Sequence, residues 1–170
     1  MLFLKFFQSL FKALNSDGTP GQVGMGIALG MAFGLTPLVS AHNLVVLAVA
    51  MLTTVSFPGV MLGWALAVPL GFALDPVFDA VGHALLVAPA LTSFWTAVVN
   101  APVVALFHLN NTIVLGSLVV WLVALIPLFL LFRVLVTRYR ATVYARLEKT
   151  RLFRAVKASK LYNLYQLLRP

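Results

Sequence analysis

Three ionisable side chains, Asp75, Asp79 and His83, are spaced four residues apart in an otherwise apolar stretch. Residues four apart share one face of a helix, so the spacing predicts an acidic face that could bind a divalent metal or relay protons. The structural alternative makes Asp75 a helix N-cap, places Asp79 at the positive end of the dipole, and puts His83 at the head-group level. No fourth ligand is evident, although His42 or His108 could fold close, so we assign no metal site.

The motifs of common catalytic sites are missing from the sequence. The absence of cysteine excludes disulfides, thiolate metal sites and cysteine nucleophiles. Ser40 lies close to His42 in the sequence, but there is no acid to orient the pair as a triad. No Walker loop, dinucleotide fingerprint, nucleophile elbow or zinc-protease motif is present. We therefore expect a protein that is not an enzyme, with no catalytic residues and no cofactor.

The composition indicates where such a chain resides. Hydrophobic residues make up 62% of the 170 positions and charged residues 9%, whereas a soluble domain carries about 25% charged residues. No Lys or Arg occurs between Lys12 and Arg133. A stretch so poor in charge needs lipid as its solvent, because Lys and Arg are costly at the bilayer centre. The same gap leaves no cation to hold a phosphate at membrane depth, unless Mg²⁺ on the acidic face substitutes.

We therefore predict an all-α, polytopic membrane protein in three parts. Residues 1–18 hold an amphipathic helix over 2–14, with Lys5 and Lys12 on one face and phenylalanines on the other, which is typical of a helix lying in the membrane interface. A signal peptide is the alternative, but lysines interrupt the apolar run and no cleavage site follows. Residues 19–136 form the membrane domain, and residues 137–170 form a basic tail.

The membrane domain begins with two short apolar segments, 20–38 and 44–57. Thr19 and Pro20 are a suitable N-cap and first-turn pair. Gly26, Gly30 and Gly34 repeat every four residues, which predicts close packing against another helix. A backbone surface for a ligand is the alternative. About 20 residues are needed to cross a bilayer. The pair is therefore either two short spans, which we favour, or a re-entrant hairpin of the kind found at transporter binding sites.

The remaining segments are 60–74, 76–87, 91–107 and 112–136. Leu74-Asp75-Pro76 is expected to end one helix and start the next, and the two short helices after it are expected to pack at the far membrane face. Basic residues flank the first and last segments, so both termini are expected in the cytoplasm of a bacterial inner membrane. The number of crossings is then four, or two if the first pair is re-entrant.

The tail carries most of the net charge of +8. We expect an imperfect amphipathic helix that contacts anionic lipid head groups or a partner protein. Nucleic acid is the less favoured partner, because no nucleic-acid module accompanies the charge. The expected contact residues are Arg138, Arg140, Arg146, Lys149, Arg151, Arg154, Lys157 and Lys160.

Nearly the whole chain resembles a domain-of-unknown-function family of small bacterial inner-membrane proteins. The matching stretches are Thr19-Pro20, GIALGMAFGLTPLVSAHNLVVL at 26–47, LGWAL at 62–66, LDPVFDAVGHALL at 74–86, NNTIVLGSLVVWL at 110–122 and EKTRLFRAVKASKLY at 148–162. The resemblance implies no activity, but members are usually encoded beside a larger uncharacterised envelope protein. It therefore favours a membrane subunit that works with a larger partner.

The expected function is a non-catalytic inner-membrane subunit or adaptor of an envelope complex, which assists lipid transfer to the larger partner. The alternative is a small transporter or channel that uses the short hairpin and the Asp75/Asp79/His83 face.

Overall fold

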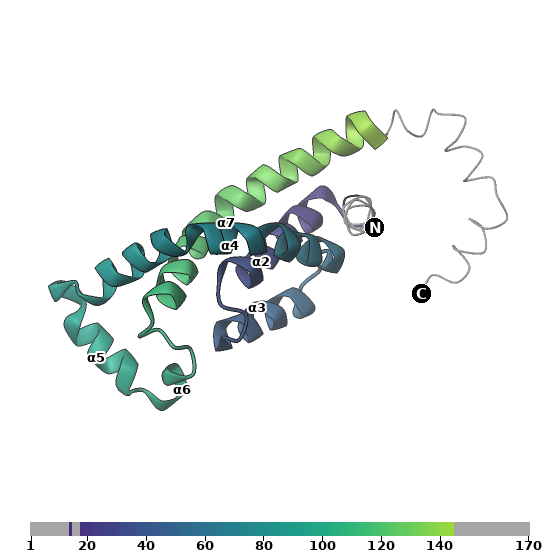
Figure 1. The fold of residues 1–170 in the computed structure, drawn as a ribbon. Coiled ribbons are helices and arrows are strands. Elements are labelled where there is room, and N and C mark those ends of the chain that lie inside the picture. The colour runs from purple at the N-terminus through teal and green to yellow at the C-terminus, as the bar shows by residue number, and fades with distance from the viewer. Residues whose placement is uncertain (1–13, 15–17, 145–170) are drawn as a thin grey trace.

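In a computed structural model, the chain is described for Leu14 and for residues 18–144, and all regular secondary structure in this part is helical (Figure 1). The all-α prediction is thereby confirmed for the described residues. The helices are α2 (Pro20–Leu35), α3 (Ala41–Leu52), α4 (Phe57–Leu86), the 3-10 turn Pro89–Leu91, α5 (Thr92–Asn100), α6 (Pro102–Ala105) and α7 (Thr112–Tyr139), which a π-helical turn continues over Arg140–Tyr144.

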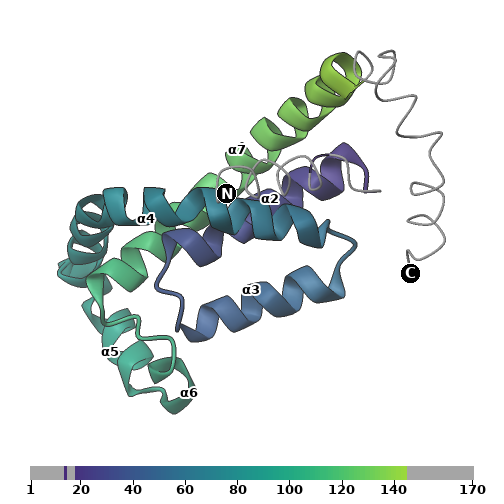
Figure 2. The same cartoon turned by 45° about the vertical axis from the view of Figure 1, so that its right-hand side comes forward.

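Helices α2 and α3 form an antiparallel hairpin. Thr19 begins α2 with a capping box, in which its hydroxyl accepts from the Gln22 N–H and the Gln22 side chain accepts from the Thr19 N–H. After the turn at 36–40, α3 runs back, and the Ser56 N–H donates to the Gln22 carbonyl at 3.1 Å. The chain thus returns to the level at which α2 began (Figure 2). The predicted cap at Thr19 is confirmed, and both segments are shorter than expected from the sequence.

Helix α4 is one continuous helix of 30 residues, so the predicted break at Asp75-Pro76 is wrong. A proline inside a helix removes one hydrogen bond and crowds the carbonyl four residues earlier. In α4, both Pro69 and Pro76 lie on the exposed side of the helix. The opposite side carries Gly71 and Gly82, which meet the backbones of α2 and α7 on either side of Pro76. Packing therefore holds the helix together, and Asp75 is an interior residue and not an N-cap.

The segment after α4 also differs from the prediction of a single helix over 91–107. It is divided into the 3-10 turn, α5 and the four-residue α6. Pro102, which has no N–H, begins α6 after the break at Ala101. These short elements gather at the end of the molecule opposite the C-terminal end of α7 (Figure 1).

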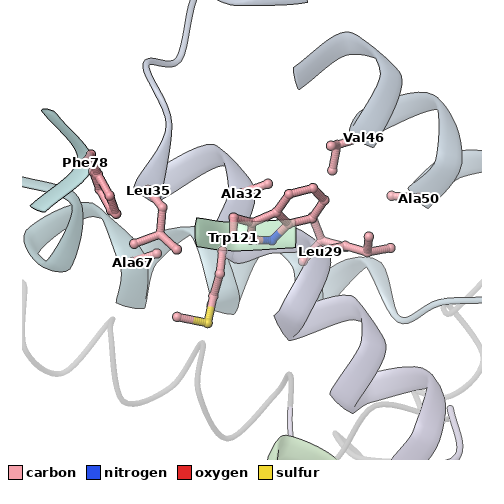
Figure 3. Close-up of a cluster of buried hydrophobic side chains, with 10 residues drawn as sticks. Leu29, Ala32, Leu35, Val46, Ala50, Ala67, Phe78 and Trp121 are labelled. Carbon is pink, nitrogen blue, oxygen red and sulfur yellow. The ribbon is translucent and has the colours of Figure 1, made fainter. Parts of the chain in front are cut away.

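Helix α7 runs antiparallel to both α2 and α4. The Asn111 side chain caps its start by accepting from the Val114 N–H at 3.1 Å. Its middle contacts α2, where the Trp121 indole N–H donates to the Ala28 carbonyl at 2.9 Å. Figure 3 shows this indole beside Leu29 and Ala32 of α2, with Val46 and Ala50 of α3 in the same buried cluster. Trp121 thus ties α7 to the hairpin.

The glycines of α2 lie against α4 at backbone distance. A Cβ on Gly30 would overlap the Val60 carbonyl oxygen, and a Cβ on Gly34 would lie 2.6 Å from the Ala67 Cβ. The facing side of α4 is also smooth, since Gly59, Gly63, Ala67 and Gly71 follow one another every fourth residue. At these contacts the residue numbers increase in the same direction along both helices, so α2 and α4 run parallel. Helix α2 therefore ends level with residues 67–71, near the middle of α4.

Two stretches, Phe57–Leu86 and Thr112–Thr142, are long and apolar enough to cross a membrane. Only 33% and 28% of their most apolar windows are buried inside the protein, which argues against core helices of a soluble domain. Helices α2 and α3, of 16 and 12 residues, are shorter than the roughly 20 residues that a crossing needs. The structure thus provides two membrane-spanning candidates and a shorter hairpin.

The predicted interfacial helix over 2–14 lies outside the described residues, apart from Leu14. The predicted tail helix is described only as far as residue 144.

Candidate functional site

The turn between α2 and α3 is a cluster of buried polar side chains. The Thr36 hydroxyl donates to the Ala32 carbonyl at 2.8 Å and lies 3.1 Å from the Asn43 Oδ1. The Asn43 amide donates to the Pro37 and Leu38 carbonyls, and the Ser40 hydroxyl also donates to Pro37. These bonds satisfy the backbone groups that the break between the helices leaves free, which a turn inside a membrane requires.

His42 is the exception in this cluster. It is 4% exposed, and neither ring nitrogen has a hydrogen-bond partner among the described residues. Its position in α3 precedes Val46 and Ala50 by one and two turns, so all three side chains share the face that packs on the core. Buried polar groups are normally hydrogen-bonded. The structure therefore shows an uncompensated imidazole beside the turn.

A cavity of about 540 Å³ lies at the tip of the hairpin. It is bounded by the last turn of α2, the middle of α4 and the start of α7. Its lining residues are Phe33, Gly34, Leu35, Thr36, Pro37, Leu38, Trp64, Val68, Gly71, Phe72, Asp75 and Ile113. Leu38, Val68 and Phe72 are exposed apolar residues on this lining. The cavity therefore opens onto an apolar part of the surface.

The three residues of the predicted acidic face have different surroundings. Asp75 is half-buried and lines the cavity. Asp79, one turn further on, is exposed and accepts a hydrogen bond from the Thr112 hydroxyl at the start of α7. His83 is exposed near the end of α4. In the part of the chain that the structure describes, no three His, Asp or Glu side chains gather as a metal site would require.

Asp79 has a structural role that differs from the one expected. Its carboxylate meets the N-terminus of α7 and not the start of its own helix. A carboxylate there is stabilised by the free N–H groups and by the helix dipole. The bond also fixes the crossing where Gly82 faces the Thr112 backbone and Gly116 faces the Phe78 backbone.

The basic residues lie at the opposite end of α7. Arg138 is exposed. The Arg140 guanidinium instead donates to the Leu14 carbonyl at 2.9 Å and to the Gly18 carbonyl at 2.8 Å. Arg140 therefore ties the end of α7 to the start of the hairpin. The predicted contacts at Arg146, Lys149, Arg151, Arg154, Lys157 and Lys160 lie outside the described residues.

The sequence interpretation missed the aromatic lining of the cavity and the second glycine row. Trp64 and Phe72 lie eight residues apart on α4, on either side of Val68, so helical spacing alone indicates that they share a face. Gly59, Gly63, Ala67 and Gly71 repeat at the same spacing as the glycines of α2. Both signals lie before Asp75 and were readable from the spacing alone.

Comparison with known proteins gives one relative without a known role. The chain is 28% identical over 156 residues to an uncharacterised protein of Treponema pallidum (strain Nichols), a match that covers 90% of this chain and 94% of the relative. No family model matches the chain, and no solved structure matches it. The site must therefore be interpreted from its own geometry.

Proposed function

We propose that this chain is a non-catalytic, integral subunit of a bacterial inner-membrane complex. In this proposal α4 and α7 are the two crossings, α2 and α3 form a re-entrant hairpin, and both termini are cytoplasmic. The basic residues that follow α7 support this orientation, because Lys and Arg near span ends are retained in the cytoplasm. The re-entrant alternative, with two crossings, thus replaces the four crossings favoured from the sequence.

The observation that carries the proposal is the depth of the hairpin tip relative to α4. Gly34, near the end of α2, meets Gly71, whereas α4 continues to Asp79 and beyond. From 71 to 79 the helix rises about 12 Å. We therefore place the tip inside the bilayer, with the cavity alongside it, between the last turn of α2, the middle of α4 and the start of α7. Such a cavity is accessible to molecules that reside in the outer leaflet.

A lipid is the ligand class that this location supports. The lining is mostly apolar, its exposed residues face the surrounding hydrocarbon, and its volume lies within the roughly 300–1,000 Å³ of typical ligand sites. We propose that the subunit holds a membrane lipid there and presents it to a larger envelope protein. The basic residues of the tail then serve as contacts to anionic head groups or to that partner.

A small transporter or channel is the second candidate. Asp75 favours it, since a carboxylate beside a re-entrant hairpin is an arrangement that ion-coupled transporters use. The apolar cluster of Leu29, Ala32, Val46, Ala50 and Trp121 supports the adaptor instead. This cluster fills the space between α2, α3 and α7 with buried apolar side chains (Figure 3).

Purification from native membranes in mild detergent tests the proposal. The adaptor predicts a larger envelope protein that co-elutes in fixed stoichiometry. Two lysine variants serve as a matched pair. Arg140→Lys loses one of the two carbonyl contacts that the guanidinium makes. Arg138→Lys loses no contact that the structure describes. A homo-oligomer that elutes alone and conducts ions or solutes in proteoliposomes would support the transporter and overturn the adaptor.

A further inference from the structure

The cavity at the hairpin tip has an unusual chemical composition. Three aromatic rings line it, those of Phe33, Trp64 and Phe72, together with the Asp75 carboxylate. The other polar groups of the lining side chains are the Thr36 hydroxyl, which is already bonded to the Ala32 carbonyl, and the Trp64 indole N–H. Within the described residues, Asp75 has no hydrogen-bond or ion-pair partner. The carboxylate is therefore the charged group of the lining, and its bonding capacity is unused.

No lysine or arginine of the described chain lies near enough to compensate this carboxylate. The arginines Arg133, Arg138 and Arg140 lie toward the C-terminal end of α7, whereas the cavity contacts Ile113 near its start. From 113 to 133 the helix rises about 30 Å. An occupant that complements the cavity must bring its own positive charge.

The lining selects among cations. A Ca²⁺ or Mg²⁺ ion needs about six oxygen ligands, and the described residues form no such cluster here. Aromatic rings beside a carboxylate are instead the arrangement that binds organic ammonium groups, by cation–π attraction and charge pairing. Phe72 is 77% exposed and Leu38 is 55% exposed, so an ammonium group held by Asp75 could extend an apolar chain from the cavity along the outside of α4.

We propose that the cavity binds the ammonium head group of a zwitterionic phospholipid. Asp75 is the counter-charge, and the rings of Phe72 and Trp64 pack against the ammonium group. This inference rests on the proposed lipid-binding role and names the lipid class. A lipid with an anionic head group is disfavoured, because Asp75 would repel it and no arginine of the described residues is close.

The test uses the whole protein, delipidated in detergent and titrated with phosphatidylethanolamine, with bound lipid counted by native mass spectrometry. Asp75→Asn keeps the shape and removes the charge, so binding should weaken about tenfold or more. The matched control is Asp79→Asn, one turn away and outside the cavity lining, which should bind as the wild type does. Phosphatidylglycerol with the same acyl chains should bind the wild type about tenfold more weakly.

Two further measurements keep the test decisive. Phe72→Leu changes an exposed residue and should reduce binding about threefold, even if Asp75→Asn fails to accumulate. Glycerophosphoethanolamine, which has the head group without acyl chains, should bind far more weakly; equal binding would identify a soluble amine as the ligand and overturn the lipid inference.

Equal affinity for the two lipids, or unchanged binding by Asp75→Asn, would also overturn this inference while leaving a co-eluting partner, and so the adaptor, intact. Selective binding of phosphatidylethanolamine without any co-eluting partner would support this inference and overturn the adaptor.

Discussion

Asp75 and Asp79 are one helical turn apart, yet their surroundings give them different roles. Asp79 is bonded to Thr112 at the start of a neighbouring helix, whereas Asp75 faces a cavity with aromatic walls. Helical spacing predicts correctly that the two lie near each other on α4, but spacing carries no information on what the neighbouring helices bring. The partner of Asp79 is 33 residues away in the sequence. The single acidic face expected from the sequence is therefore two separate positions.

His42 provides a prediction at the same scale. Its buried imidazole has no partner among the described residues, and an unsatisfied buried polar group costs about 1–3 kcal/mol. We expect His42→Leu, which fills similar space without polar atoms, to raise the unfolding temperature of the detergent-solubilised protein, with a gain of about 1 kcal/mol.

His42→Gln is the control, because it retains polar groups and should not stabilise. A clear loss of stability in His42→Leu would show that the imidazole is hydrogen-bonded in the native membrane, and would contradict the described environment.

At the scale of elements, the glycine rows were readable, whereas the proline at position 76 was misleading. Gly26, Gly30 and Gly34 pointed to a close helix contact, since only small residues let two backbones approach. Pro76 following Asp75 resembled a helix start, because the same residue pair begins helices in water-exposed chains. In α4, the tertiary contacts of Gly71 and Gly82 outweigh the single lost hydrogen bond. Local sequence patterns therefore located the contacts but not the ends of the helix.

The α2–α4 contact gives a prediction with a control inside the same helix. Gly30→Ala places a methyl group on the Val60 carbonyl, and such overpacking should destabilise the protein by about 1–3 kcal/mol. Gly21→Ala lies in the first turn of α2, where the nearest atom to a new Cβ is the Thr19 hydroxyl oxygen at 3.8 Å.

Gly21→Ala should be neutral or slightly stabilising, since alanine favours the helix. The amounts of folded protein by size-exclusion chromatography and the unfolding midpoints compare the two variants. Equal behaviour would show that α2 and α4 are not in backbone contact.

At the scale of the whole molecule, polarity divides the described chain between its two ends. Arg133, Arg138 and Arg140 lie toward one end, whereas Asp75, Asp79 and His83 lie toward the other. The apolar surfaces of α4 and α7 lie between these ends, and the hairpin covers only part of that length. This division supports the proposed arrangement of two crossings with a re-entrant hairpin, in which the cavity has access to one leaflet.

Cysteine labelling in intact membranes measures the depth of the hairpin tip most directly, and the natural chain contains no cysteine to interfere. Ala90→Cys should react with a membrane-impermeant maleimide added outside, and Thr137→Cys only after permeabilisation. Val39 is 94% exposed at the tip, but we place it in hydrocarbon, where a thiol does not ionise to the reactive thiolate. Val39→Cys should therefore react from neither side until detergent is added; labelling from outside, as for Ala90→Cys, would establish four crossings and contradict the re-entrant hairpin.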